Sequence, residues 1–180
     1  MKKSLIVYYS LSGLTKKVVD VLKKFTDADI YEIDLEKPYS RLTAYTIGLG
    51  HCKTGYEPII RNDIDLSDYD KIFIGGPAWW FTYAPPIHSF IKKYNLGDKV
   101  IYPFGTATSN FGNYFERFSK ECKAKEIKNP LKIDITTGDV IIPSEIEYSY
   151  ETIFKEKLNI LVYSLETLIA EKYETIIKRN

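Results

Sequence analysis

The chain has 180 residues, which is a usual length for one domain and enough to bury an apolar core without disulfides or metal ions. Its 25 Lys and Arg residues nearly balance 24 Asp and Glu residues, so the formal net charge is only +1. A field this weak gives no reason to expect nucleic acid or an anionic membrane as a partner.

Cysteine content and the start of the chain predict a cytoplasmic protein. Cys52 and Cys122 are far apart and outside any C-x-x-C pattern, so we expect two free thiols in a reducing compartment. The apolar run after Met1 is too short for a signal peptide. No stretch approaches the roughly 18 apolar residues that a membrane-spanning helix needs.

The first part of the chain predicts a strand, a loop, a helix and a second strand. Residues 5–9 form a continuous β-rich apolar run, as in a strand that is buried on both faces. After a polar loop, apolar residues at helical spacing predict an amphipathic helix: Val18, Val19, Leu22 and Phe25. Residues 30–35 alternate like a strand, which completes a βαβ unit.

The remaining elements continue this alternation. Three more buried strands are expected at residues 71–75, 99–104 and 131–135. Helices are expected at residues 41–47, 85–94, 111–123 and 150–178. The second of these helices begins with Pro85 and Pro86, which suit a first helical turn. Residues 136–148 resemble an insertion or an extra β-hairpin, and their sequence assigns them no role.

Strands that alternate with helices predict a three-layer α/β fold. We expect a doubly wound, five-stranded parallel sheet in the order 2-1-3-4-5, with residues 1–180 in a single domain. In such sheets, ligands bind beyond the carboxyl ends of the strands, next to strands 1 and 3. The loops after strands 1, 3 and 4 should therefore meet at one edge of the sheet.

The loop after the first strand has the composition of a phosphate site. Residues 10–15 read Ser-Leu-Ser-Gly-Leu-Thr, with three hydroxyls and one glycine ahead of a helix. Free backbone N–H groups and the helix dipole favour an anion there. The loop is neither a Walker A motif nor Gly-x-Gly-x-x-Gly, which suits a monophosphate held by neutral donors. A capped helix start with an ordinary polar turn is the alternative.

Aromatic residues dominate the loop after the third strand. Trp79, Trp80 and Phe81 stand in a row, which fits neither a helix face nor an alternating strand. At least one ring should face solvent or a ligand, and aromatic planes are natural partners of a flat π-system. The alternative is that the tryptophans simply pack over the edge of the sheet.

The loop after the fourth strand is small and rich in hydroxyls. Residues 105–110 read Gly-Thr-Ala-Thr-Ser-Asn and offer donors to the carbonyl oxygens of a ring. Such a loop is often an ordinary turn. Here, however, a phosphate site, an aromatic platform and a donor-rich loop all fall where the topology puts a ligand.

Together these motifs resemble those of flavodoxins and flavodoxin-like FMN-binding proteins, in particular the short-chain bacterial type with a Pro-x-Trp-Trp loop. The resemblance covers nearly the whole chain and implies a flavodoxin-like fold with non-covalently bound FMN. It implies phosphate contacts from the first loop: Ser10, Ser12, Gly13, Leu14 and Thr15. It places the isoalloxazine along Pro77, Ala78, Trp79 and Trp80, with Thr106, Ala107, Thr108 and Ser109 on its pyrimidine side.

Three features depart from the pattern of that family. Leu14 replaces a frequent Asn or other polar residue, and Phe81 replaces a common glycine. The third loop lacks a glycine-rich stretch and is one residue shorter. These differences concern individual contacts to the ring and leave the implied FMN binding in place.

The resemblance implies redox chemistry, and it leaves the use of that chemistry open. A flavodoxin-type electron carrier, which serves a redox partner protein, is favoured by the length of the chain. The alternative is an NAD(P)H-dependent FMN oxidoreductase of the quinone reductase type, whose partner would be a small-molecule acceptor such as a quinone. It is considered because dedicated carriers are usually strongly acidic and this chain is not. A flavin-free interaction domain on the same fold is a third alternative.

No side chain is assigned a catalytic role, because FMN itself would supply the chemistry. His51 and His88 are far apart in sequence and lack Asp, Glu or Cys neighbours at ligand spacing, so no metal site is expected. The oligomeric state is left open.

Overall fold

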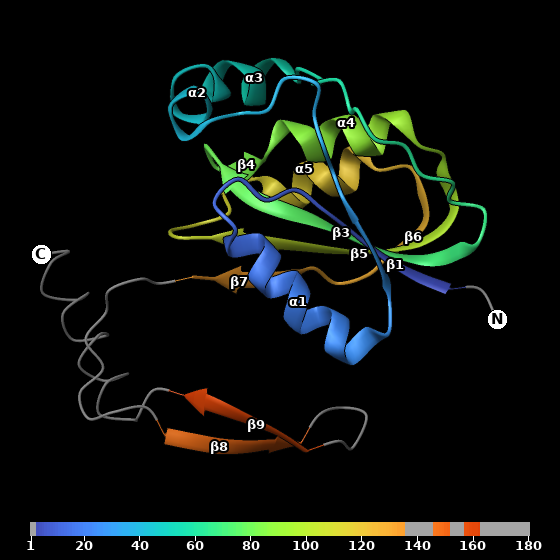
Figure 1. The fold of residues 1–180 in the computed structure, drawn as a ribbon, viewed down its shortest axis with the longest axis vertical. Coiled ribbons are helices and arrows are strands. Elements are labelled where there is room, and N and C mark those ends of the chain that lie inside the picture. The colour runs from blue at the N-terminus through green and yellow to red at the C-terminus, as the bar shows by residue number, and fades with distance from the viewer. Residues whose placement is uncertain (1–2, 136–145, 152–156, 163–180) are drawn as a thin grey trace, which may run out of the picture. The chain divides into compact units, whose positions relative to one another are not determined.

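A computed structural model of the chain describes residues 3–135, 146–151 and 157–162 (Figure 1). The chain divides into two compact units, Met1–Ile135 and Thr136–Asn180. The first unit holds the predicted parallel sheet and its helices. The assignment of residues 1–180 to a single domain stays a prediction.

The central strands of the first unit occur in the predicted order. β2 (Asp29–Glu32), β1 (Lys3–Tyr8), β3 (Tyr69–Trp79) and β5 (Leu96–Ala107) lie side by side in that sequence. Two short strands share the fifth place, since β6 (Ala124–Ile127) pairs with the first half of β5 and β7 (Leu131–Asp134) with its end. β7 matches the predicted fifth strand. The sequence does not predict β6, because Ala-Lys-Glu-Ile contains no apolar run.

Helices cover both faces of this sheet, which confirms the three-layer α/β fold (Figure 1). α1 (Leu14–Thr26) lies on one face, and α4 (Pro85–Lys93) and α5 (Tyr114–Glu121) lie on the other. α2 (Arg41–Thr46) and α3 (Gly48–Thr54) belong to the long connection between β2 and β3. α5 is shorter than predicted, and α3 was not expected. Among the described residues, no helix is long and apolar enough to cross a membrane.

Alternate residues of the strands point into two apolar cores, one on each face of the sheet. The larger core contains Ile72, Ile74 and Ile87, all fully buried, on the side of α4. The smaller core contains Ile6 and Val19 on the side of α1. Burial of each such side chain stabilises the fold by about 1.5–3 kcal/mol. The last turn of α1 does not take part, because Phe25, expected on its apolar face, is 59% exposed.

Gly75 is a position at which the neighbouring strand leaves no room for a side chain on β3. It pairs with Tyr8 of β1 on one side and with Phe104 of β5 on the other. A Cβ atom on Gly75 would lie 2.2 Å from the carbonyl oxygen of Phe104 and 2.6 Å from its ring. Only glycine therefore allows the Phe104 side chain to be buried at this register.

The second unit contains an antiparallel hairpin of β8 (Ile146–Glu151) and β9 (Lys157–Val162). The predicted helix over residues 150–178 is therefore wrong at residues 150–151 and 157–162. Its apolar residues at 158, 160 and 162 recur at every second position, which is the strand period. The hairpin expected within residues 136–148 begins later, at Ile146. Residues 136–145, 152–156 and 163–178 of these two predictions lie outside the described residues.

Both cysteines are free, as the sequence predicts, and both are buried. Burial raises the pKa of the Cys52 thiol and of the Cys122 thiol to about 11. Both thiols therefore stay protonated at neutral pH and pack as small apolar side chains.

A buried polar cluster joins α4 to α5. His88 Nε2 lies 3.0 Å from Glu121 Oε2, and Glu121 also accepts hydrogen bonds from the Tyr83 hydroxyl (2.5 Å) and from Arg117 Nε (2.8 Å). Burial lowers the pKa of His88 and outweighs the attraction of Glu121. His88 is therefore neutral and donates to Glu121. Burial alone would raise the pKa of Glu121, but the hydrogen bonds from Arg117 and Tyr83 lower it.

We expect the free energy of unfolding to fall as the pH drops from 7 towards 5. The pKa of His88 is lower in the folded chain than its unfolded value of about 6.5, so below that pH the unfolded chain binds a proton that the folded chain does not. One such proton contributes a slope of at most about 1.4 kcal/mol per pH unit. Urea unfolding of the wild type and of His88→Gln from pH 7 to pH 5 measures this slope. If the free energy of unfolding changed with pH equally in both proteins, His88 would not be the source of the pH dependence.

Candidate functional site

The three loops singled out in the sequence meet at the carboxyl edge of the sheet and line one cavity. Its volume is about 120 Å³. Its lining takes three residues from each loop and Ile135: Ser12, Leu14, Thr15, Pro77, Ala78, Trp79, Thr106, Ala107 and Thr108. The topology argument therefore brings together loop residues from Ser12 to Thr108, which are about 100 positions apart in the chain.

The first loop ends in an uncapped helix. Gly13 is the N-cap residue of α1, with φ at 84°, and an added Cβ would meet open space. Backbone N–H groups in the first turn of a helix have no acceptor within the helix, and Gly13 has no side chain to accept from them. Ser10 Oγ accepts from the Lys16 N–H at 3.3 Å. The helix dipole and the other free amides of this turn favour an anion.

A buried hydrogen bond ties the first loop to the third. The hydroxyls of Thr15 and Thr106 are 2.9 Å apart, and both side chains are buried. Thr15 lies in the first turn of α1, whereas Thr106 lies near the end of β5. This bond fixes the start of α1 against the sheet edge, because either hydroxyl would be left without its buried partner if the two moved apart.

The second loop is a tight hairpin. β3 continues to Trp79 and pairs with β4 (Thr82–Tyr83), so that Trp80 and Phe81 form a two-residue turn. Their φ angles are 50° and 66°. A turn with positive φ at both central residues normally carries Asn-Gly, because at positive φ a β-carbon lies too close to the backbone carbonyl oxygen. The loop therefore holds two large aromatic residues in an unfavourable backbone conformation.

The two tryptophans of this loop have different surroundings. Trp79 lines the 120 Å³ cavity and makes edge contacts with the rings of Tyr9 and Tyr39. Trp80 faces α2, where its Nε1 donates to the Ala44 carbonyl at 3.3 Å. It borders a separate cavity of about 620 Å³, next to α3 and α5. Trp79 is therefore the ring that is available at the candidate site.

The third loop begins inside the sheet. Thr106 and Ala107 are the last pairs of β5 with β7, and both are buried. Thr108 and Ser109 follow the strand and are exposed. Four of the predicted site residues do not line the cavity: Ser10, Gly13, Trp80 and Ser109. The cofactor-binding role of all thirteen residues stays a prediction.

Tyr114 supports the site, and sequence reasoning did not single it out. Its hydroxyl is fully buried, accepts from the Gly76 N–H at 3.1 Å and donates to the Phe104 carbonyl at 2.9 Å. It thereby joins β3 to β5 where the second and third loops begin. The sequence offered no signal beyond a tyrosine on a predicted helix, because both partners are backbone groups, ten and 38 positions away in the chain, and a backbone group leaves no mark in the sequence.

A doubly wound parallel sheet with an open helix start after its first strand and an aromatic loop after its third defines the flavodoxin-like class of α/β proteins. The chain belongs to the flavodoxin family, whose sequence model matches residues 3–48 and 49–140.

Solved structures with the same fold agree with this assignment. The chain is similar to a candidate flavoprotein from Bacteroides uniformis, with 23% identity, a TM-score of 0.65, and coverage of 76% of this chain and 92% of that one. It is also similar to a flavoprotein from Lactobacillus acidophilus solved in complex with FMN, with 24% identity, a TM-score of 0.63, and coverage of 73% and 93%. The apo form of the flavoprotein from the same bacterium gives 25% identity, a TM-score of 0.61, and coverage of 74% and 93%.

Replacement of Phe81 by glycine should stabilise the fold by about 0.5–1 kcal/mol, because it relieves the strain of a positive φ. The Phe81 ring is 58% exposed, so little packing is lost. Urea unfolding of Phe81→Gly measures the change.

Phe25→Gly is the matched control, since Phe25 is 59% exposed and lies in a helix. Both variants carry the same extra freedom of glycine in the unfolded chain. Only the helical one should be destabilised, by about 0.5 kcal/mol. Equal destabilisation of both variants would mean that the turn is not strained.

Proposed function

We propose that this chain binds FMN without a covalent link at the carboxyl edge of its sheet and acts as a flavodoxin-type electron carrier. The observation that carries the proposal is the convergence of the three loops on one cavity. Membership of the flavodoxin family and similarity to a flavoprotein solved with FMN support the choice of cofactor. We expect a redox partner protein and a cytoplasmic location, in line with two free, buried cysteines.

The start of α1 fits the phosphate of FMN. Ser10 Oγ accepts from the Lys16 N–H, the other amides of the first turn have no acceptor within the helix, and Ser12 belongs to the same loop. Ser12 is exposed and lines the cavity, so its hydroxyl can donate to a phosphate oxygen. These donors are neutral, which suits a monophosphate. Ser10, Ser12, Gly13, Leu14 and Thr15 would therefore hold this group.

The second and third loops fit the ring of the cofactor. Pro77, Ala78 and Trp79 form one wall of the cavity, and Trp79 offers an aromatic ring to a planar π-system. Thr106, Ala107, Thr108 and Ser109 would supply backbone and hydroxyl donors to ring oxygens. When bound, FMN supplies the redox chemistry.

The residues of the site would bind and orient the cofactor and would not exchange protons with it. The ten residues that line the cavity include no ionisable side chain. Burial raises the pKa of the nearby Tyr9 to about 12, so its phenol also stays protonated at neutral pH. We assign no general acid or base to the site.

An NAD(P)H-dependent FMN oxidoreductase remains the second candidate. It is favoured by the net charge of +1, since electrostatic steering to a basic partner needs an acidic carrier. Anaerobic mixing of the FMN-loaded protein with NADH or NADPH separates the two. A carrier should show no oxidation of either nucleotide beyond that of free FMN, with or without a quinone acceptor. Saturable, protein-dependent oxidation would favour the enzyme.

The purified protein, incubated with FMN and desalted, should retain the two visible absorption bands of a flavin. It should also quench the fluorescence of added FMN, because the ring would lie next to Trp79. A colourless protein that fails to quench FMN would leave the three loops as ordinary turns.

Ser12→Asp should weaken FMN binding at least about tenfold, which corresponds to about 1.4 kcal/mol, because it places a carboxylate against the phosphate. Riboflavin lacks the phosphate, so its affinity should change less than about twofold. The fold should survive, since Ser12 is exposed and an acidic residue is favourable near a helix N-terminus.

Ser119→Asp adds the same charge on an exposed position of α5 and serves as the control for this measurement. Fluorescence titration of both variants with FMN and with riboflavin gives four dissociation constants. An equal loss of FMN and riboflavin affinity in Ser12→Asp would argue against a phosphate at this loop.

A further inference from the structure

The connection between β2 and β3 folds into a lobe of its own, residues 36–59, which we call the cap. Its two ends are joined by a bridge between Leu35 and Ile60 and by a hydrogen bond from the Glu36 N–H to the Ile59 carbonyl at 3.0 Å. α2 and α3 form its outer turns. The cap therefore closes on itself and is long enough to enclose space.

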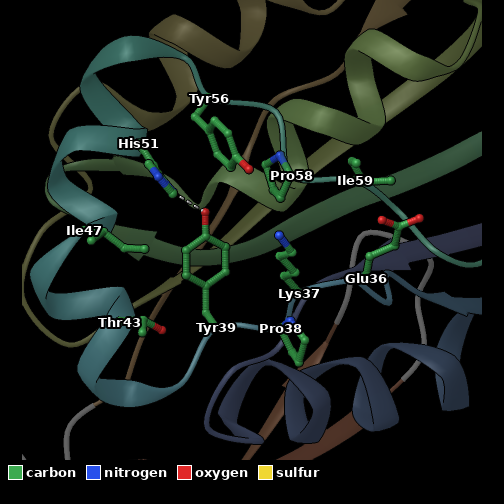
Figure 2. A pocket seen from close by; sticks show the side chains of 10 residues that line it. All are labelled: Glu36, Lys37, Pro38, Tyr39, Thr43, Ile47, His51, Tyr56, Pro58 and Ile59. Atoms are coloured by element: carbon green, nitrogen blue, oxygen red, sulfur yellow. Dashed lines mark hydrogen bonds between the residues drawn. The ribbon is translucent and has the colours of Figure 1, made fainter.

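A pocket of about 330 Å³ lies inside the cap (Figure 2). All of its lining comes from this one segment: Glu36, Lys37, Pro38, Tyr39, Thr43, Ile47, His51, Tyr56, Pro58 and Ile59. Aromatic rings, prolines and isoleucines dominate this set. The volume and the mainly apolar lining with a few polar groups are typical of small-molecule sites. None of these residues lines the cavity of the proposed cofactor site.

Two hydrogen-bonding side chains meet inside this pocket. The Tyr39 hydroxyl lies 2.6 Å from His51 Nδ1, and the dashed line in Figure 2 marks this hydrogen bond. Burial raises the pKa of Tyr39, so its phenol keeps its proton and remains a donor. The His51 ring stacks on Tyr56, with centroids 4.0 Å apart at 29°. The polar groups are thus set among flat rings.

Apolar side chains at this pocket are left open to solvent. Ile47 is 48% exposed, Tyr56 46% and Ile59 63%. Scattered exposed apolar residues are normal, but a cluster around one pocket marks a binding surface. A planar ring compound would cover these side chains and lie beside the rings of Tyr39 and Tyr56.

The polar groups of the pocket select the chemistry of the ligand. The Tyr39 hydroxyl and His51 Nδ1 share one hydrogen bond, so this pair offers one further donor to a ligand, and the Lys37 ammonium offers others. The Lys37 ammonium points into the pocket in Figure 2 and makes no ion pair within the described residues. Glu36 supplies one opposite charge, so the lining as a whole favours no charged ligand. A neutral ligand with an acceptor oxygen suits this set best.

The pocket is one aromatic contact away from the proposed cofactor site. The ring of Tyr39 meets that of Trp79 edge to face, with centroids 5.2 Å apart. Trp79 in turn lines the cavity at the sheet edge. A molecule in the cap pocket would therefore be separated from that cavity by the side chains of Tyr39 and Trp79.

The geometry points to the cap pocket as a binding site for a small, neutral, planar cyclic carbonyl compound of the quinone class, whose oxygen accepts a hydrogen bond from the Tyr39–His51 pair. The binding claim stands on the cap alone. A role of this pocket in electron transfer to the bound compound rests on the proposed function, because the electrons would come from FMN.

Equilibrium dialysis with tetramethyl-1,4-benzoquinone tests this site. The probe has no free ring position for addition of a thiol, so the two cysteines cannot trap it. We expect saturable binding with a dissociation constant below about 0.1 mM, both for the protein without FMN and for the FMN-loaded protein. Tetramethylbenzene, which has the ring and methyl groups but no oxygen, should bind at least about tenfold more weakly.

Ile59→Glu should weaken binding of the quinone at least about tenfold, because it sets a carboxylate against the apolar face of the ring. Tyr39→Phe keeps the ring and removes the donor, and it should weaken binding about threefold to tenfold. Leu42→Glu is the matched control, since Leu42 belongs to the same cap, is 72% exposed and does not line the pocket. Its affinity should stay within about twofold of wild type.

The outcomes separate this site from the cofactor site. The proposal would be overturned if the wild type did not bind the quinone, if FMN displaced the bound quinone, or if Ile59→Glu bound the quinone as tightly as the wild type. Equal affinity for tetramethylbenzene would overturn the assignment of a carbonyl ligand. Quinone binding with the expected variant pattern in a protein that does not bind FMN would support the pocket and reject the proposed function.

Discussion

The approach of β3 to β5 at Gly75 is the constraint on which the rest of the molecule depends. One residue with no side chain pairs with Tyr8 on one side and Phe104 on the other, and a methyl group there would overlap the Phe104 carbonyl. The three central strands are therefore held at one register, and they lead into their loops within a few residues of this point. A site that is assembled from three loops needs strands held at fixed positions, because loops are more mobile than the elements that they connect.

Hydrogen bonds between uncharged groups hold the starts of the loops in place against the strands. The Tyr114 hydroxyl joins β3 to β5 through two backbone groups, and the bond between Thr15 and Thr106 joins α1 to the end of β5. Each connects elements that are distant in sequence, and each is buried, so breaking it leaves an unsatisfied polar group that costs about 1–3 kcal/mol. Because neither bond carries a net charge, the edge of the sheet is ordered without placing a fixed charge where an anion is proposed to bind.

Sequence reasoning predicted the features that depend on local pattern. Continuous apolar runs gave the buried strands, and the rule for parallel sheets gave their order and the meeting of the three loops. It failed where a long-range contact decides the outcome. β6 is held at the edge of the sheet by β5 although its own sequence is polar. The different surroundings of Trp79 and Trp80 depend on the Ala44 carbonyl, more than thirty positions away, and no local pattern contains that information.

The cap supplies a contact that helps to hold the strained turn of Trp80 and Phe81 in place. Trp80 and Phe81 hold unfavourable φ angles, which costs about 1–3 kcal/mol for each residue unless surrounding contacts compensate. The bond of Trp80 to the Ala44 carbonyl is one such contact, and it comes from the cap. Trp79 at the end of β3 also reaches the cap, with its ring in contact with Tyr9 of the sheet edge and with Tyr39 of the cap. The Trp79 ring therefore touches Tyr39 of the cap pocket and also lines the cavity at the sheet edge. A displacement of Tyr39 would change the position of this ring at the candidate cofactor site.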